Sequence, residues 1–178
     1  YWSRVGNSSL KPEKALQSNL GLDWSIASGK GFSAGLSACA FCNLVKDKIV
    51  ATPTLFVWRM HNLGRALMAG CELGARADWK VHPCISLSAT AGYTYMYAVD
   101  ISDRTAKNYL HQIRYTPRHS GSVTFSADSK WLTASYLLTA VGVRYFQDQN
   151  SLSSSMPAYF DHGVSLSRDF TIKAARIY

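Results

Sequence analysis

The chain has 178 residues and a formal net charge of +8, and hydrophobic residues make up 47% of it while charged residues make up only 17%. The apolar content excludes a disordered chain, and the absence of any run of about 18 apolar residues excludes a membrane-spanning helix. The Lys and Arg residues are scattered along the chain and form no stripe or cluster, so no nucleic-acid partner is expected.

Apolar side chains recur at every second position along most of the chain, which is the period of a β-strand. The first two runs cover residues 16–26 and 32–40, and the turn between them, SGKG at 28–31, favours a hairpin. A third run covers 63–79. The fourth, 84–100, alternates most clearly, because Ile, Leu, Ala, Tyr and Val occupy its odd positions while Ser, Thr, Gly and Asp fill most even ones.

Four further runs, at 122–128, 131–146, 158–167 and 171–178, bring the number of candidate strands to eight. Several runs reach a dozen residues, whereas strands of soluble proteins usually have about 5–6. A strand that crosses a bilayer needs about 9–11 tilted residues. The sequence therefore predicts an all-β, antiparallel, transmembrane barrel segment of about eight long strands.

The connections between these runs alternate between short and long, as they do in outer-membrane barrels. The short ones lie at 28–31, 80–83, 129–130 and 168–169, and the long ones at 46–61, 101–119 and 147–157. Trp24, Trp79 and Trp131 lie beside short turns, and the Tyr residues at 93, 95 and 97 lie toward a long loop, as two interfacial aromatic girdles require. A soluble β-sandwich with one polar face would alternate similarly and stays open as an alternative.

A series of short motifs follows in order along nearly the whole chain. It comprises GNSSLKPE at 6–13, KDKI at 46–49, HNLG at 61–64, GCEL at 70–73, YTPRH at 115–119, GVRY at 142–145 and MPAY at 156–159. The first resembles the GN-x-x-LKPE element of TonB-dependent outer-membrane receptors, and the others are similar to later strand ends of that family.

The resemblance implies a 22-stranded barrel in the bacterial outer membrane, of which residues 1–178 would form one part of the wall within a single barrel domain. The plug domain and the closing strand are expected to lie outside this chain, which begins without Met and ends in an extended run. The resemblance also implies active uptake of a large scarce solute, such as a ferric siderophore, haem or a corrinoid. The implied partners are outer-membrane lipid, the receptor's own plug, the TonB complex reached through that plug, the transported small molecule and, in some members, a surface lipoprotein.

Candidate ligand-binding residues are the aromatic, basic and polar side chains of the three long loops, whose character suits a large, often anionic ligand. They are Trp58, Arg59, Tyr109, His111, Arg114, Tyr115 and Gln149. Glu72 and Arg76 are four residues apart on the polar face and are predicted to face the barrel lumen.

No motif indicates catalysis, a cofactor or a metal site, so the chain is not expected to be an enzyme. The Cys39-x-x-Cys42 pair is predicted to point to opposite faces of a strand, and Cys71 and Cys84 are too far apart to complete a zinc site. Two other classes of protein stay open. One is a complete eight-stranded outer-membrane barrel with an adhesive or structural role, and the other is a soluble β-rich binding domain.

Overall fold

A single antiparallel sheet dominates the structure, a computed structural model that describes residues 3–5, 7–29, 31–53, 57–168, 170–172 and 175–177. Within these residues, seven strands follow one another in the order β10-β7-β6-β5-β4-β3-β2, and β1 (Ser3–Val5) pairs in parallel with β4 outside this path. The seven are β2 (Lys14–Gly29), β3 (Phe32–Pro53), β4 (Val57–His82), β5 (Ile85–Asp100), β6 (His119–Ser129), β7 (Thr133–Val141) and β10 (Tyr159–Ser167).

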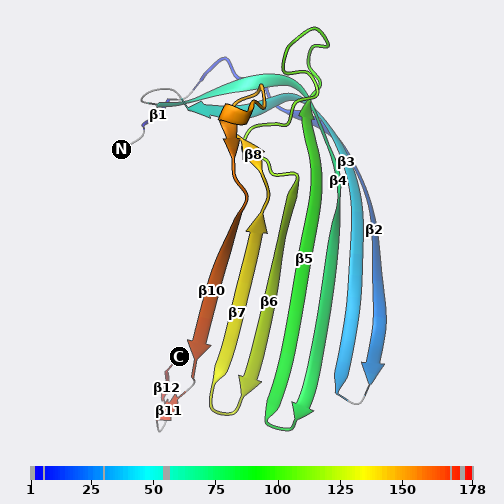
Figure 1. Cartoon of the computed structure of the whole chain (residues 1–178), viewed down its shortest axis with the longest axis vertical. Helices are drawn as coiled ribbons and strands as arrows, with labels where there is room; N and C mark the ends of the chain where they lie inside the picture. The colour runs from blue at the N-terminus through cyan, green and yellow to red at the C-terminus, as the bar shows by residue number, and fades with distance from the viewer. Residues whose placement is uncertain are drawn as a thin grey trace.

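The connections of the sheet differ at its two ends (Figure 1). Short hairpins join β2 to β3, β4 to β5 and β6 to β7 at the lower end. In the last of these, the Ser129 hydroxyl accepts a hydrogen bond from the Leu132 amide at 3.1 Å, which closes the turn. The upper end carries residues 101–118 and 142–158, which include β8 (Arg144–Tyr145), the 3-10 turn η1 (Leu152–Ser154) and β9 (Ser155–Met156).

The register gives the sheet one apolar and one polar face. Leu22, Ala38, Leu73 and Tyr93 are consecutive cross-strand partners on β2 to β5, and because side chains alternate along a strand they share one face. The neighbouring ladder on the other face is polar or small, with Ser37, Gly74, Gly92 and Ser122. Large apolar side chains stay exposed on the first face, including Leu20 at 78% and Trp24 at 64%.

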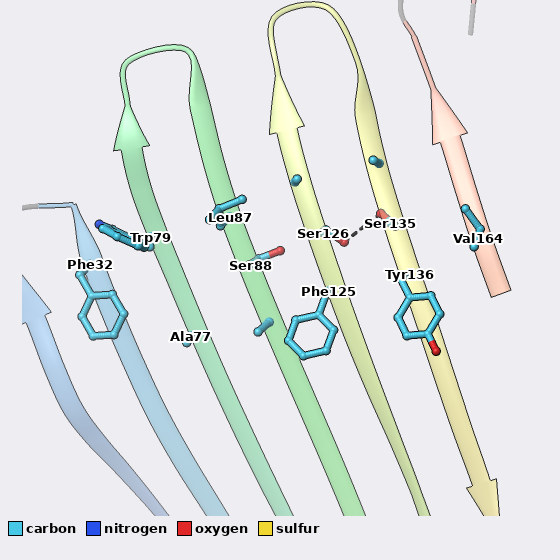
Figure 2. A pocket seen from close by; sticks show the side chains of 13 residues that line it. Phe32, Ala77, Trp79, Leu87, Ser88, Phe125, Ser126, Ser135, Tyr136 and Val164 are labelled. Atoms are coloured by element: carbon cyan, nitrogen blue, oxygen red, sulfur yellow. Dashed lines mark hydrogen bonds between the residues drawn. The ribbon is translucent and has the colours of Figure 1, made fainter. Parts of the chain in front are cut away.

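A shallow hollow of ≈ 520 Å³ lies on the apolar face near the short turns. Figure 2 shows Phe32, Trp79, Phe125 and Tyr136 around it, with Ala77 between them. Phe125 and Tyr136 are direct cross-strand partners. Nothing in the described part of the chain forms a second layer over this face. If the sheet were surrounded by water, these large apolar side chains would be exposed to solvent without apolar contacts.

The buried apolar side chains of the described residues are few and lie toward the upper end. They are Val45, Ala66, Ala98 and Val99. Here the irregular segment 110–118 runs beside β5, with the Ile113 amide bonded to the Ala98 carbonyl at 2.9 Å. No helix among the described residues is long and apolar enough to cross a membrane.

Seven of the eight predicted strands are confirmed, with three corrections. The predicted run 171–178 is instead two short strands, β11 (Phe170–Ile172) and β12 (Ala175–Ile177), which pair with each other, while residues 173, 174 and 178 lie outside the described residues. The run 131–146 divides into β7 and β8, because the chain leaves the sheet after Val141. The predicted long loop 46–61 is mostly strand, since β3 and β4 continue as one hairpin to Pro53 and Val57.

Candidate ligand-binding site at the loop end of the sheet

The upper part of the β3–β4 hairpin is set off from the rest of the sheet by an irregularity at Asp47. Lys46 pairs with Arg65, and the next pair is Lys48 with Leu63, so Asp47 and Gly64 are skipped. Asp47 has a positive φ of 56°, a conformation that Asp adopts more readily than most residues. Asn62 holds this position by donating from its amide nitrogen to the Asp47 carbonyl at 2.6 Å.

Gly64 allows the following loop to approach the hairpin closely. A Cβ atom at Gly64 would lie 2.7 Å from the Ser102 Oγ atom, and the Ser102 hydroxyl accepts a hydrogen bond from the Arg65 amide at 2.8 Å. The upper hairpin consequently bends across the loop end of the sheet, as Figure 1 shows.

Residues 101–118 are ordered by carboxylates that accept bonds from their own loop. Asp100, only 6% exposed, accepts from the Ser102 amide at 2.8 Å and from the Asn108 side chain at 2.6 Å. Asp103 accepts from the Thr105 amide at 2.8 Å. This backbone hydrogen bond lowers the pKa of the Asp103 carboxyl below its ordinary value.

Two side-chain contacts tie this loop to residues 142–158. The Asn150 side chain makes two hydrogen bonds to the backbone of Gln112. Its Oδ1 atom accepts from the Gln112 backbone amide at 2.5 Å, and its Nδ2 atom donates to the Gln112 carbonyl at 3.0 Å. Arg114 forms a bidentate ion pair with Asp148. Its Nε atom donates to Oδ1 at 2.5 Å, and its Nη2 atom donates to Oδ2. The hydrogen bond to Asp148 raises the pKa of the Arg114 guanidinium above its ordinary value, so this side chain keeps its positive charge.

The hairpin and the two tied loops enclose a cavity of ≈ 300 Å³, at the lower limit of small-molecule sites. It is lined by Lys48, Val50, Ala51, Trp58, His61, Leu63, Asp100, His111, Gln112, Ile113, Arg114, Tyr115, Thr116 and Asp148. His111 donates from Nδ1 to the Asp148 carbonyl at 3.1 Å, which fixes the orientation of its ring. Lys48 also lines the cavity. Unlike Arg114, its ammonium group has no carboxylate partner among the described residues.

Four of the seven loop residues predicted from the sequence line this cavity, namely Trp58, His111, Arg114 and Tyr115. The other three, Arg59, Tyr109 and Gln149, are not part of its lining. Lys48, His61 and Asp148 also line the cavity but were not predicted from the sequence. The first two lie on the upper part of the β3–β4 hairpin, where the apolar alternation ceases, and no sequence signal places Asp148 beside Arg114.

Glu72 and Arg76 lie on the polar face of β4, as their even positions indicate. Arg76 does not pair with Glu72 but with Asp78, from Nε to Oδ2 at 2.7 Å. Cys39 and Cys42 take opposite faces of β3, and all four cysteines are free thiols. Among the described residues, no group of three metal-ligating side chains comes together.

The Arg114–Asp148 pair is expected to hold the two loops together. Asp148→Asn leaves Arg114, whose side chain is 24% exposed, without its anion, and losing a hydrogen bond to a charged group costs about 1.5–3 kcal/mol. Hydrogen exchange of the amides at 110–116 should then quicken about tenfold or more. Exchange of the amides at 142–158 should quicken as well in Asp148→Asn, whereas the matched variant Asp103→Asn, in the same loop but outside the pair, should leave exchange at 142–158 unchanged. Equal exchange at 142–158 in the two variants would contradict the role of the pair.

Solved structures with related folds are similar to nearly the whole chain. BauA, the ferric preacinetobactin receptor from Acinetobacter baumannii, matches with a TM-score of 0.62 and 19% identity over 91% of this chain and 23% of its own. FyuA, the ferric yersiniabactin uptake receptor from Yersinia pestis, matches with 0.59 and 21% over 88% and 22%. The copper transporter OprC matches with 0.59 and 17% over 89% and 23%. No curated protein sequence matches the chain.

These observations define a class of protein. A one-layered sheet of long antiparallel strands, with an exposed apolar face, short turns at one end and long ordered loops at the other, has the architecture of an outer-membrane β-barrel wall. The family model for the TonB dependent receptor-like beta-barrel matches residues 1–178, and the chain belongs to this family. It spans about a quarter of the length of the solved structures that it resembles.

Proposed function

We propose that the chain forms part of the wall of an outer-membrane receptor that takes up a large scarce solute with energy delivered through TonB. The family match over residues 1–178 is the observation that carries this proposal. The family consists of transport receptors of the outer membrane of Gram-negative bacteria rather than enzymes. The apolar face supports the same placement, because bilayer lipid would cover the side chains that no protein layer covers.

The two edges of the sheet support a larger barrel. Within the described residues, β2 and β10 each pair on one side only and not with each other. In a bilayer, each unsatisfied backbone group costs several kcal/mol, so further strands must flank both edges. We propose that residues 1–178 are one part of a single barrel domain and that a plug domain fills its lumen against the polar face. Glu72 and Arg76 would face that lumen. This favours a receptor over an eight-stranded barrel closed by this chain alone.

The solute that we propose is a metal chelate of the siderophore, haem or corrinoid type. Two of the similar structures, FyuA and BauA, are receptors for ferric chelates. The cavity at the loop end would hold one group of such a solute, with Trp58 and Tyr115 offering apolar ring surfaces and Lys48 a positive charge that has no carboxylate partner within the described part of the chain. At ≈ 300 Å³ it is a subsite, and loops of the remaining wall would complete the site.

Deleting the complete receptor gene tests the transport function. The deletion strain is expected to lose uptake of one probe from a panel of radioiron-labelled ferric siderophores, haemin and cyanocobalamin, and removing TonB should abolish the same uptake. Uptake that persists without TonB would overturn the proposal.

Lys48→Gln in the complete receptor tests the subsite. It should raise the KM of that uptake about tenfold, because a hydrogen bond to a charged group contributes about 1.5–3 kcal/mol. Lys107→Gln makes the same charge change in an exposed residue outside the cavity lining and serves as the control. An unchanged KM in Lys48→Gln would remove the cavity from the binding site while leaving the transport function intact.

A further inference from the structure

Three basic residues stand in direct register on three adjacent strands. Lys14 on β2 is the cross-strand partner of Lys46 on β3, and Lys46 is the partner of Arg65 on β4. All three side chains are exposed. We call this set the basic row. With strands about 4.8 Å apart, it spans about 10 Å.

Like charges that face each other directly across strands destabilise a sheet, so the basic row needs an anion to offset its repulsion. The described residues do not supply one, since none of the three cations has an ion pair with a carboxylate there. Two acidic residues adjoin the row in the sequence. Glu13, next to Lys14, accepts a hydrogen bond from the Ile49 amide at 2.5 Å, and Asp47, next to Lys46, forms no ion pair with the row among the described residues.

The basic row lies on the apolar face of the sheet, at its loop end. Leu16, Leu44 and Leu67 form the next register row on that face, and Leu16 and Leu44 are 68% and 44% exposed. Further down the same face follow Leu20, Ala40 and Cys71. Three cations therefore border an exposed apolar surface, with the cations where the strands emerge toward the long loops.

We propose that the basic row binds the phosphate groups of an anionic membrane lipid whose acyl chains lie on the apolar surface below it. This inference rests on the proposed function, because it requires that this face contact the outer membrane. The adjoining leucines favour a lipid over a free phosphate ion, which would gain nothing from them. A span of about 10 Å allows two phosphate groups to be contacted together. The transported solute has its own site in the cavity, whose lining contains none of the three residues.

The test uses the complete receptor in detergent with diphosphoryl lipid A as the probe, and native mass spectrometry as the readout. The triple variant Lys14→Gln, Lys46→Gln, Arg65→Gln should bind lipid A about a hundredfold more weakly, since each basic residue at an anionic lipid surface contributes a factor of about five. The control Arg104→Gln, Lys107→Gln, Lys130→Gln removes the same charge elsewhere and should bind as the wild type does. Inorganic pyrophosphate at an equal concentration should not displace the lipid.

The single variant Lys46→Gln controls for the possibility that the triple variant binds weakly because it misfolds. It removes the central charge and relieves repulsion with both neighbours, so it should fold at least as well as the wild type and lose lipid A affinity about fivefold. Equal lipid binding in wild type and variants, or equal competition by pyrophosphate, overturns the inference while outer-membrane insertion and solute uptake still support the receptor. Absence of the wild-type receptor from the outer membrane overturns both proposals together.

Discussion

Gly70→Ala is expected to prevent the barrel wall from assembling. Gly70 lies on β4 between Phe41 and Met96 of the neighbouring strands. A Cβ atom there would lie 2.0 Å from the Tyr95 carbonyl oxygen and 2.8 Å from the Phe41 Cζ atom. The oxygen belongs to the backbone, so it cannot yield without breaking the pairing of β4 with β5. We expect a loss of about 3 kcal/mol or more, the upper end of what overpacking costs.

The measurement is the fraction of complete receptor that reaches the outer membrane and shifts its gel mobility on heating. Gly21→Ala is the matched control, because a Cβ atom at Gly21 would meet nothing within 4 Å. Removing a glycine from a strand interior should even stabilise it, by about 0.5–1 kcal/mol. Normal assembly of Gly70→Ala would show that β4 and β5 are farther apart in the membrane than they are in this structure.

The strands of the wall could be predicted from the sequence because each has two chemically different faces. The run 84–100 corresponds to β5 (Ile85–Asp100), and 122–128 lies within β6 (His119–Ser129). In both strands, apolar and polar residues alternate with a period of two because one face has apolar surroundings and the other has polar surroundings. The run 171–178 has no such consistent alternation, and it does not continue the wall.

The upper β3–β4 hairpin was missed because it lies beyond the apolar face. Past Asp47 the two strands no longer have one apolar surface, so alternation ceases although the pairing continues to Pro53 and Trp58. Pairing there depends on the partner strand and on Asn62, which bonds to both Lys11 and Asp47. Such long-range contacts leave no local pattern in the sequence.

The cavity was predictable only in part for the same reason. Loop position and residue type indicated Trp58, His111, Arg114 and Tyr115, which line it. The pairing of Arg114 with Asp148 joins residues 34 apart in sequence, and it neutralises a cation that the sequence alone presents as free for a ligand. Lys48 consequently replaces Arg114 as the positive charge that we expect a solute to meet.

A charge placed on the apolar face should be far more damaging than the same charge one residue along the strand. Val123 of β6 lies on that face between Ala91 and Leu138. Val123→Arg would put a guanidinium against bilayer hydrocarbon, which costs about 2–4 kcal/mol near the middle of a membrane barrel. The amount of folded complete receptor in the outer membrane should fall sharply.

Thr124→Arg is the matched control, since it introduces the same side chain on the polar face, between Thr90 and Leu137. A wet lumen accepts a charge there, so this variant should insert nearly as the wild type does. The comparison separates a membrane barrel from the soluble β-rich domain that the sequence left open. In a soluble sandwich the apolar face would be a core, and Val123→Arg would abolish folding in water without detergent. The reverse order of the two effects, with Thr124→Arg the more damaging, would mean that the polar face meets lipid and would overturn the orientation on which both proposals rest.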